Sequence, residues 1–159
     1  MKRRRKGTVS EEVTTVKQFK LFSLLLVVIL LTGCLSPRLD FTISPDPIKI
    51  QYGQSEVKGL TLNFKTSGFS LSYKLDQVEI RLEDKEGELI LNEVKDLNES
   101  IPIVPGIKKP YELPAISLED IANIEPKEAY DVYVKGEYTL TITVTGTKTS
   151  TATAKVIFE

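Results

Sequence analysis

The sequence predicts an all-β domain, built as an antiparallel β-sandwich of about seven or eight strands and preceded by a targeting segment. Apolar and polar residues alternate with a period of two in several short segments, which is typical of strands with one buried face. Turn residues separate these segments at regular intervals, as in most sandwiches. The 126 residues from Cys34 onward are enough for one domain and too few for two.

The first half of the domain contains several expected strands. Pro45 and Pro47 divide Asp40–Tyr52 into two extended pieces, because proline cannot donate a hydrogen bond to a strand ladder. Apolar residues at every second position of Gly59–Thr66 indicate a half-buried strand. The same alternation predicts further strands over 69–75, 77–82 and 88–94, with a hairpin turn at 84–87.

The last third of the chain has the clearest β pattern. We expect strands over Ala129–Val134, Glu137–Val144 and Thr151–Phe158. The last two should form a hairpin that turns at Gly146. Their apolar residues alternate with threonines, which are favoured on solvated sheet faces.

A proline-rich connection, 96–127, separates these two groups of strands. It holds five of the eight prolines, so we expect no long regular element there. One short helical turn is expected near its end, with Ser117 as the N-cap and Asp120 at the capping-box position. We expect any binding surface on this connection or at a sheet edge, where backbone groups and apolar side chains are exposed.

An apolar run near the N-terminus indicates export. Lys17 and Lys20 precede Leu21–Leu31, whose eleven residues are fewer than the about 20 that a membrane-spanning helix needs. A short apolar run behind positive charge is typical of a secretory signal. Two alternatives remain for the start of translation: Met1, with a long polar front region, or a misassigned start with the true one near Val16.

The run ends in a tetrapeptide that resembles the bacterial lipobox, which is an apolar residue, two small ones and a cysteine. The tetrapeptide is Leu31-Thr32-Gly33-Cys34. The resemblance implies a signal-peptide helix within residues 1–33, cleavage before Cys34 and lipid attachment to its thiol. Residues 34–38 would then be a lipidated tether, and 39–159 the folded domain. Because Cys34 is the only cysteine, no disulfide can form within the chain.

The resemblance also implies a location in the cell envelope. The lipid on Cys34 would hold the protein on the outer face of the cytoplasmic membrane, or on an outer membrane if the organism has one. Leu35 follows the cysteine, where an aspartate would resemble an inner-membrane retention signal. The sequence therefore leaves two alternatives for the location of the protein, the cytoplasmic membrane and an outer membrane.

A nine-residue segment resembles the next-to-last strand of immunoglobulin-like and PKD-like bacterial domains. In Gly136–Val144, a glycine-x-tyrosine pattern enters an alternating strand, and the resemblance implies that Tyr138 is a structural corner tyrosine. The chain lacks the Cys–Trp–Cys core and the PKD motif of those families. The resemblance therefore implies a fold and no activity.

Composition excludes several kinds of chemistry. The chain has no histidine, so serine–histidine and cysteine–histidine hydrolysis and the usual zinc sites are excluded, and we expect no enzyme activity, metal or cofactor. Residues 34–159 hold 14 basic and 20 acidic groups, a net charge of −6, which would repel nucleic acid and anionic lipid head groups. The acidic run of Glu83, Asp84, Glu86 and Glu88 fits a solvated turn better than a calcium loop, because its spacing matches no EF-hand.

These observations predict a non-catalytic, membrane-anchored surface lipoprotein, an immunoglobulin-like binding or structural module of the envelope. Its expected partners are the membrane, through the lipid on Cys34, and an envelope protein or glycan. The alternative is an accessory lipoprotein that binds a small ligand or glycan for a transporter, which would need a concave pocket. Four tyrosines could form a sugar-stacking surface for that role: Tyr111, Tyr130, Tyr133 and Tyr138.

Overall fold

The computed structural model describes residues 38–67, 72–122 and 124–159. These residues belong to one compact unit, Pro37–Glu159. The predicted signal peptide and nearly all of the predicted tether lie outside the described residues.

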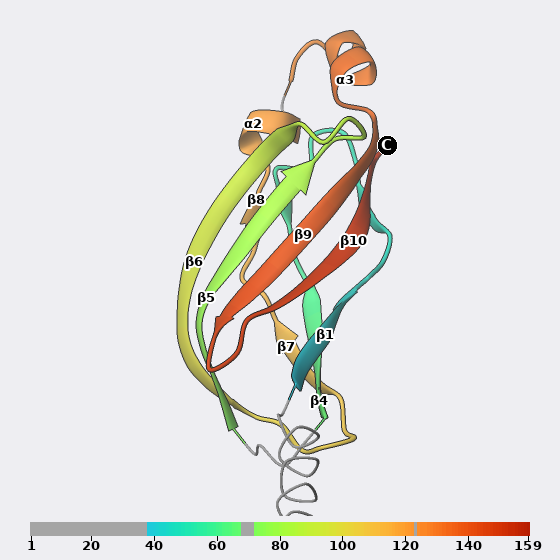
Figure 1. The fold of residues 1–159 in the computed structure, drawn as a ribbon. Helices are drawn as coiled ribbons and strands as arrows, with labels where there is room; N and C mark the ends of the chain where they lie inside the picture. Colours follow the sequence, from blue (N-terminus) through green and yellow to red (C-terminus); the bar gives the residue numbers. More distant parts are fainter. Residues whose placement is uncertain (1–37, 68–71, 123) are drawn as a thin grey trace, which may run out of the picture. The chain divides into compact units, whose positions relative to one another are not determined.

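The described residues form a mostly β structure with ten strands and two short helices (Figure 1). The strands are β1 (Arg38–Ser44), β2 (Ile48–Ile50), β3 (Glu56–Val57), β4 (Thr61–Ser67), β5 (Ser72–Glu83), β6 (Leu89–Pro102), β7 (Lys109–Glu112), β8 (Ile116–Ser117), β9 (Gly136–Gly146) and β10 (Ser150–Phe158). The helices are α2 (Glu119–Ala122) and α3 (Lys127–Tyr133).

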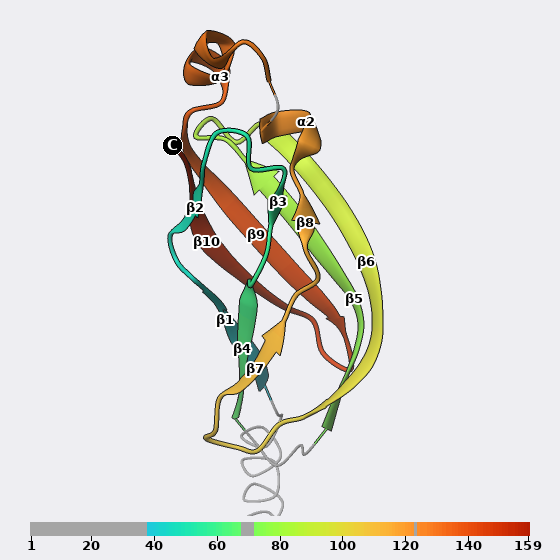
Figure 2. The ribbon, with the colours of Figure 1, turned by 180° about the vertical axis from the view of Figure 1, so that it is seen from behind.

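The strands are arranged in three sheets. One sheet has the order β1-β4-β7, a second has the order β2-β10-β9-β5-β6, and β3 pairs with β8 in a third. The five-stranded sheet is long and curled, and the view from behind shows the two smaller sheets lying across its concave side (Figure 2). The core therefore lies between the curled sheet and the smaller ones.

The expectation of purely antiparallel pairing is wrong at one point, because β2 pairs in parallel with β10. The chain leaves the β1-β4-β7 sheet after Ser44 and joins the five-stranded sheet at Ile48. Pro45 and Pro47 lie at this crossing, as predicted, because neither can donate to a strand ladder. The predicted division of this segment into two extended pieces is confirmed.

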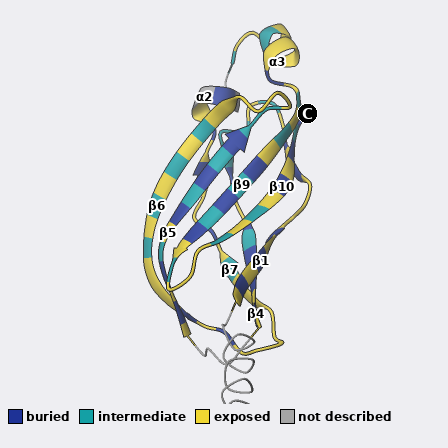
Figure 3. Cartoon of the chain, in the orientation of Figure 1, coloured by how far each residue is buried: buried dark blue, intermediate teal, exposed yellow. Residues whose placement is uncertain are grey.

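The core is formed by alternate residues of the central strands, which appear as alternating colours along β5 and β9 (Figure 3). Fully burying one large apolar side chain contributes roughly 1.5–3 kcal/mol to folding. The core also contains one buried hydroxyl pair, in which Thr66 Oγ1 lies 2.8 Å from Tyr73 Oη. Thr66 donates its own proton to the carbonyl of Arg38 at 3.0 Å, so Tyr73 donates to Thr66.

A β-bulge explains why the alternation in β5 changes phase. Tyr73 and Leu75 are buried at odd positions, whereas Val78 and Ile80 are buried at even positions. The pairing of β5 with both neighbours shifts between Leu75 and Gln77, where β5 has one residue more than β9 and β6 has one residue more than β5. The predicted strands at 69–75 and 77–82 are therefore one continuous strand from Ser72 onward, and residues 68–71 lie outside the described part.

The strand expected at Ala129–Val134 is wrong, because Lys127–Tyr133 forms the helix α3. Tyr130 and Val134 are four residues apart and both are buried, and the amide of Val134 donates to the carbonyl of Tyr130 at 2.9 Å. A spacing of four fits one helical face as well as it fits alternate strand positions. Val132 would share the face of Tyr130 and Val134 in a strand, but it is 72% exposed, which fits the helix.

The proline-rich connection is also more regular than expected. Strand β6 continues to Pro102, so residues 96–102 extend the strand whose first part was predicted at 88–94. The remaining residues contain β7, β8 and α2. Helix α2 begins at Glu119 and Ser117 belongs to β8, so Ser117 does not directly precede the helix.

Candidate functional site

The residues predicted for lipid attachment lie outside the described part of the structure. They are Leu31, Thr32, Gly33 and Cys34. In the described residues, no helix is long and apolar enough to cross a membrane.

Tyr138 lies two residues into β9 and is half-buried. Its hydroxyl donates to the carbonyl of Val134 at 2.7 Å, four residues upstream. Its ring meets that of Phe158 edge-on at 4.9 Å between centroids. Burial raises the pKa of Tyr138, and the charge of Asp84 raises it further. The hydroxyl therefore stays protonated and keeps donating well above neutral pH.

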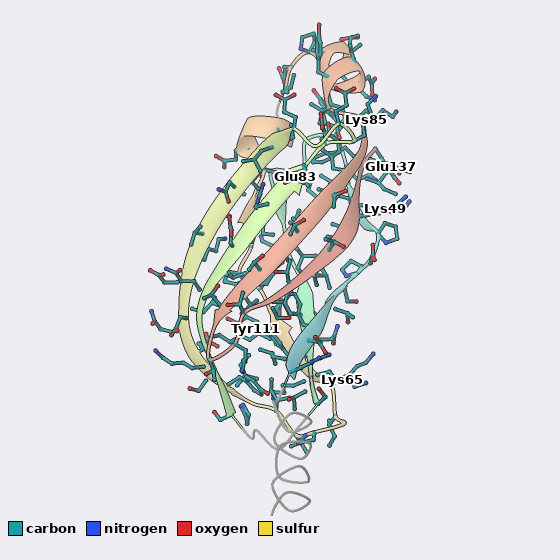
Figure 4. The ribbon with its side chains drawn as sticks, viewed as in Figure 1. Lys49, Lys65, Glu83, Lys85, Tyr111 and Glu137 are labelled. Atoms are coloured by element: carbon teal, nitrogen blue, oxygen red, sulfur yellow. The ribbon has the colours of Figure 1, made fainter. Side chains whose placement is uncertain are left out.

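The four tyrosines considered for sugar stacking do not form one surface. Tyr111 lies on β7 against Phe64, far from α3 (Figure 4). Tyr130 is fully buried, while Tyr133 on the same helix is 77% exposed. Since a stacking platform needs several exposed rings together, this arrangement gives the glycan interpretation no support.

The acidic run near β5 forms a hairpin turn. One carboxylate oxygen of Asp84 accepts hydrogen bonds from the amides of Glu86 and Glu88, both at 2.8 Å. Glu83 pairs instead with Arg81 at 2.8 Å. No group of three or more metal-ligating side chains occurs among the residues described.

Strand β6 forms an edge of the curled sheet and is more exposed than the central strands. Strand β6 pairs only with β5, so its outer backbone groups face no other strand in the described part of the chain. None of its side chains from Leu89 to Ser100 is buried, and Figure 3 shows this as an edge without the dark colour of β5. Three apolar side chains are exposed along it: Leu89 at 46%, Ile90 at 38% and Val94 at 57%.

A half-open groove lies between this edge and the chain that leads into α2. Its volume is about 130 Å³. Strand β6 contributes Ile90, Leu91 and Glu93, and the facing wall consists of Ser117, Leu118, Glu119 and Ile121. Leu118 and Ile121 are buried and fix this wall to the core. The groove therefore joins a sheet edge to the proline-rich connection, the two places where a binding surface was expected.

Glu93 supplies a carboxylate at the groove. Its Oε1 lies 3.1 Å from the ammonium of Lys95, which also donates to the carbonyl of Ala115 at 2.6 Å. Its Oε2 is shielded from solvent and has no hydrogen-bond partner among the described residues. A carboxylate oxygen that is shielded from water and accepts no hydrogen bond lowers the stability of the fold. A ligand that donates a hydrogen bond to this oxygen would therefore be favoured there.

A second cavity is a packing gap in the core. It has a volume of about 20 Å³ and is lined only by apolar side chains, among them Ile50, Leu60 and Val156. That volume is close to one water-sized probe, and an apolar gap of this kind stays dry. The groove beside β6 is thus the better candidate for binding.

Sequence reasoning did not single out Glu93 or the wall of the groove. The available signal was the pair of charged residues, Glu93 and Lys95, at alternate positions between Leu91 and Leu97. Charges that point inward are typical of an edge strand, which they protect from pairing with other chains.

The sequence matches no protein-family model and no curated protein sequence. Among solved structures, the chain is similar to the crystal structure of Spo0M, a sporulation control protein from Bacillus subtilis, with a TM-score of 0.41 and 12% sequence identity. The match covers 77% of this chain and 49% of that one, so this chain spans about half the length of the solved structure.

Proposed function

We propose that this chain is a non-catalytic lipoprotein, anchored in the cell envelope through Cys34, whose immunoglobulin-like domain binds an extended segment of an envelope protein. The anchor rests on the lipobox-like tetrapeptide that ends at Cys34. The binding role rests on one observation above all, the groove between β6 and α2 with its shielded, unpaired Glu93 oxygen.

The proposal of an immunoglobulin-like domain is supported by the strand order. The strands β1-β4-β7 face the sheet β2-β10-β9-β5-β6, and the first strand region divides between the two. The bond from Tyr138 to Val134 at the start of the next-to-last strand also fits such a domain. Two packed sheets with these connections are a common scaffold for binding at edges and loops.

The size of the groove favours a protein segment over a small molecule. Sites for free ligands usually enclose about 300–1,000 Å³. The groove encloses about 130 Å³, which suits a single side chain better. An added strand along β6 could place one side chain there, and a lysine or arginine would supply the donor that Oε2 of Glu93 lacks. For the same reason the alternative of a small-ligand lipoprotein has less support.

The anchor is tested by mass spectrometry of the protein extracted from membranes. We expect a chain that begins at Cys34 and carries lipid on the thiol and amine. A thiol without lipid, or Leu21–Leu31 still attached, would contradict the proposal.

The binding role is tested by placing a photo-crosslinking residue at Ile90 in cells that export the chain. We expect a discrete adduct that Glu93→Lys abolishes, because a positive charge there would repel the cationic side chain. Glu86→Lys is the matched control, since it reverses an exposed acid in the hairpin turn and should leave the adduct unchanged. A crosslinker at exposed Thr153 on β10 should give no adduct. Equal adducts from both crosslinkers, or one that survives Glu93→Lys, would contradict the role of the groove.

A further inference from the structure

Four basic side chains gather at the end of the domain where β1 begins. Arg38 is in register with Ser67 at the end of β4, and Lys65 lies two residues earlier on that strand. Lys109 is the first residue of β7 and pairs with Phe64, which directly precedes Lys65 in the chain. Lys108 precedes it in the loop between β6 and β7, which lies at the same end in both views (Figures 1 and 2).

The same loop exposes two apolar side chains. Val104 is 51% exposed and Ile107 is 61% exposed. Between them lie Pro105 and Gly106, and the amide of Ile107 donates to the carbonyl of Val104 at 3.0 Å. Gly106 has a φ of +80°, which together with the preceding proline fits a type II turn. Such a turn is rigid and brings its first and last residues, here the two apolar ones, close together.

Ion pairs with described acids do not neutralise the charges at this end. Seven of the 14 basic residues from Cys34 onward form ion pairs with described acids, and the four at this end do not. Asp40 is the acid closest to them in strand register, opposite Lys65. The rest of residues 34–159 holds ten basic and 20 acidic groups. An anionic surface would therefore attract this end and repel the remainder of the domain.

We infer that this end is a second membrane contact, at which Val104 and Ile107 enter the head-group region of an anionic bilayer and the four basic residues bind its phosphates. Apolar tips flanked by lysine and arginine are the composition that favours a bilayer interface. The net charge of −6 predicts that an anionic bilayer repels the domain, but this sum combines a basic end with an acidic remainder.

This inference rests on the proposed lipid at Cys34. Arg38 is the fourth residue after Cys34, so the connecting chain reaches at most about 14 Å when extended. A domain tethered that closely stays at a high effective concentration near the head groups, so two apolar side chains and four charges are sufficient for contact.

The test uses the full lipidated protein in vesicles of phosphatidylglycerol and phosphatidylcholine. Ile107→Cys provides the single free thiol for an environment-sensitive fluorophore, because Cys34 is blocked by lipid. We expect brominated acyl chains to quench this label, and quenching to weaken with phosphatidylcholine alone or at high salt. A label at Val132→Cys, 72% exposed on α3 at the opposite end, should not be quenched.

Charge reversal separates this contact from simple tethering. Lys108→Glu with Lys109→Glu should abolish the quenching at position 107. Lys85→Glu, at the far end in Figure 4, should leave it unchanged. A lipidated protein whose label at 107 is not quenched, or is quenched equally after charge reversal, would overturn the membrane contact and leave the anchor standing. An unmodified Cys34 in the same sample would overturn both.

Discussion

Among the described glycines, Gly146 is the one at which an added methyl group should lower the stability of the fold most. It ends β9 opposite Leu75, beside the bulge in β5. A Cβ at Gly146 would overlap the carbonyl oxygen of Lys74 and lie 2.8 Å from its carbonyl carbon, where real contacts stay beyond 3.0 Å. Both atoms belong to backbone, so no flexible side chain can move aside.

The free energy of unfolding that Gly146→Ala removes can be estimated from the contacts that break when β5 and β9 move apart. Moving the strands apart disrupts two hydrogen bonds of 2.9 Å, from Thr147 N to the Lys74 carbonyl and from Lys74 N to Thr147 Oγ1. Each contributes about 1 kcal/mol, and overpacking adds roughly 1–3 kcal/mol. The lower entropy of the unfolded alanine chain returns about 0.4–1 kcal/mol. We expect a net loss of about 2–4 kcal/mol, which lowers the melting temperature by roughly 10 °C.

The assay is thermal unfolding of the full chain in detergent, followed by far-ultraviolet circular dichroism because the chain has no tryptophan. Gly87→Ala is the matched control. Gly87 has a φ of +84°, and a Cβ added there would meet open space. Gly87→Ala should therefore lower stability only through the left-handed backbone conformation, by about 1–2 kcal/mol. If Gly146→Ala loses no more stability than Gly87→Ala, the steric argument is refuted.

Three further changes test other parts of the domain. Tyr73→Phe removes the hydroxyl that donates to Thr66, and should lower the free energy of unfolding by about 1 kcal/mol in urea titrations. Tyr138→Phe removes the bond to the carbonyl four residues upstream, with a loss of similar size, about 1 kcal/mol, in the same titrations. The third concerns pH: hydrogen bonds from Lys49 and then Gln51 lower the pKa of Glu159. A lowered folded pKa means that this carboxylate stabilises the fold above its unfolded pKa, and that the contribution is lost as pH falls through the folded value. Urea titrations from neutral to acidic pH should therefore show Glu159→Gln approaching the parent chain as the pH falls.

Each of these expectations has a clear contrary result. A Tyr73→Phe or Tyr138→Phe variant as stable as the parent would show that the hydroxyl adds nothing beyond the ring. A stability difference for Glu159→Gln that stays constant through the acidic range would show that the carboxylate is not linked to folding. Added salt should reduce that difference, because the pair of Lys49 and Glu159 is exposed.

The local elements could be predicted because their causes are local. The alternation of Leu60, Leu62 and Phe64 requires only that one face of a strand be buried. The break at Pro45 and Pro47 follows from the missing amide protons. By contrast, the spacing of Tyr130 and Val134 fits both a strand and a helix, and only the exposure of Val132 in the folded domain distinguishes the two.

For the candidate site, the sequence predicted the type of location but not the residues that form it. A sheet edge and the proline-rich connection were the expected binding places, yet no local pattern indicates that Glu93 lies across a groove from Leu118. Which strand forms the edge depends on pairings between residues far apart in the chain, as does the parallel pairing of β2 with β10. Such pairings are set by the whole fold and leave no signal in a window of a few residues.

The amino-acid sequence alone shows that the chain has no histidine, that its one cysteine follows a short apolar run, and that strands predominate. The positions of the charges on the domain depend on how the strands pair. Arg38, Lys65 and Lys109 are far apart in the chain, and strand pairing brings them to one end of an otherwise acidic domain. Net charge is a sum over residues, whereas attraction to a surface depends on which residues face it, and folding alone sets that.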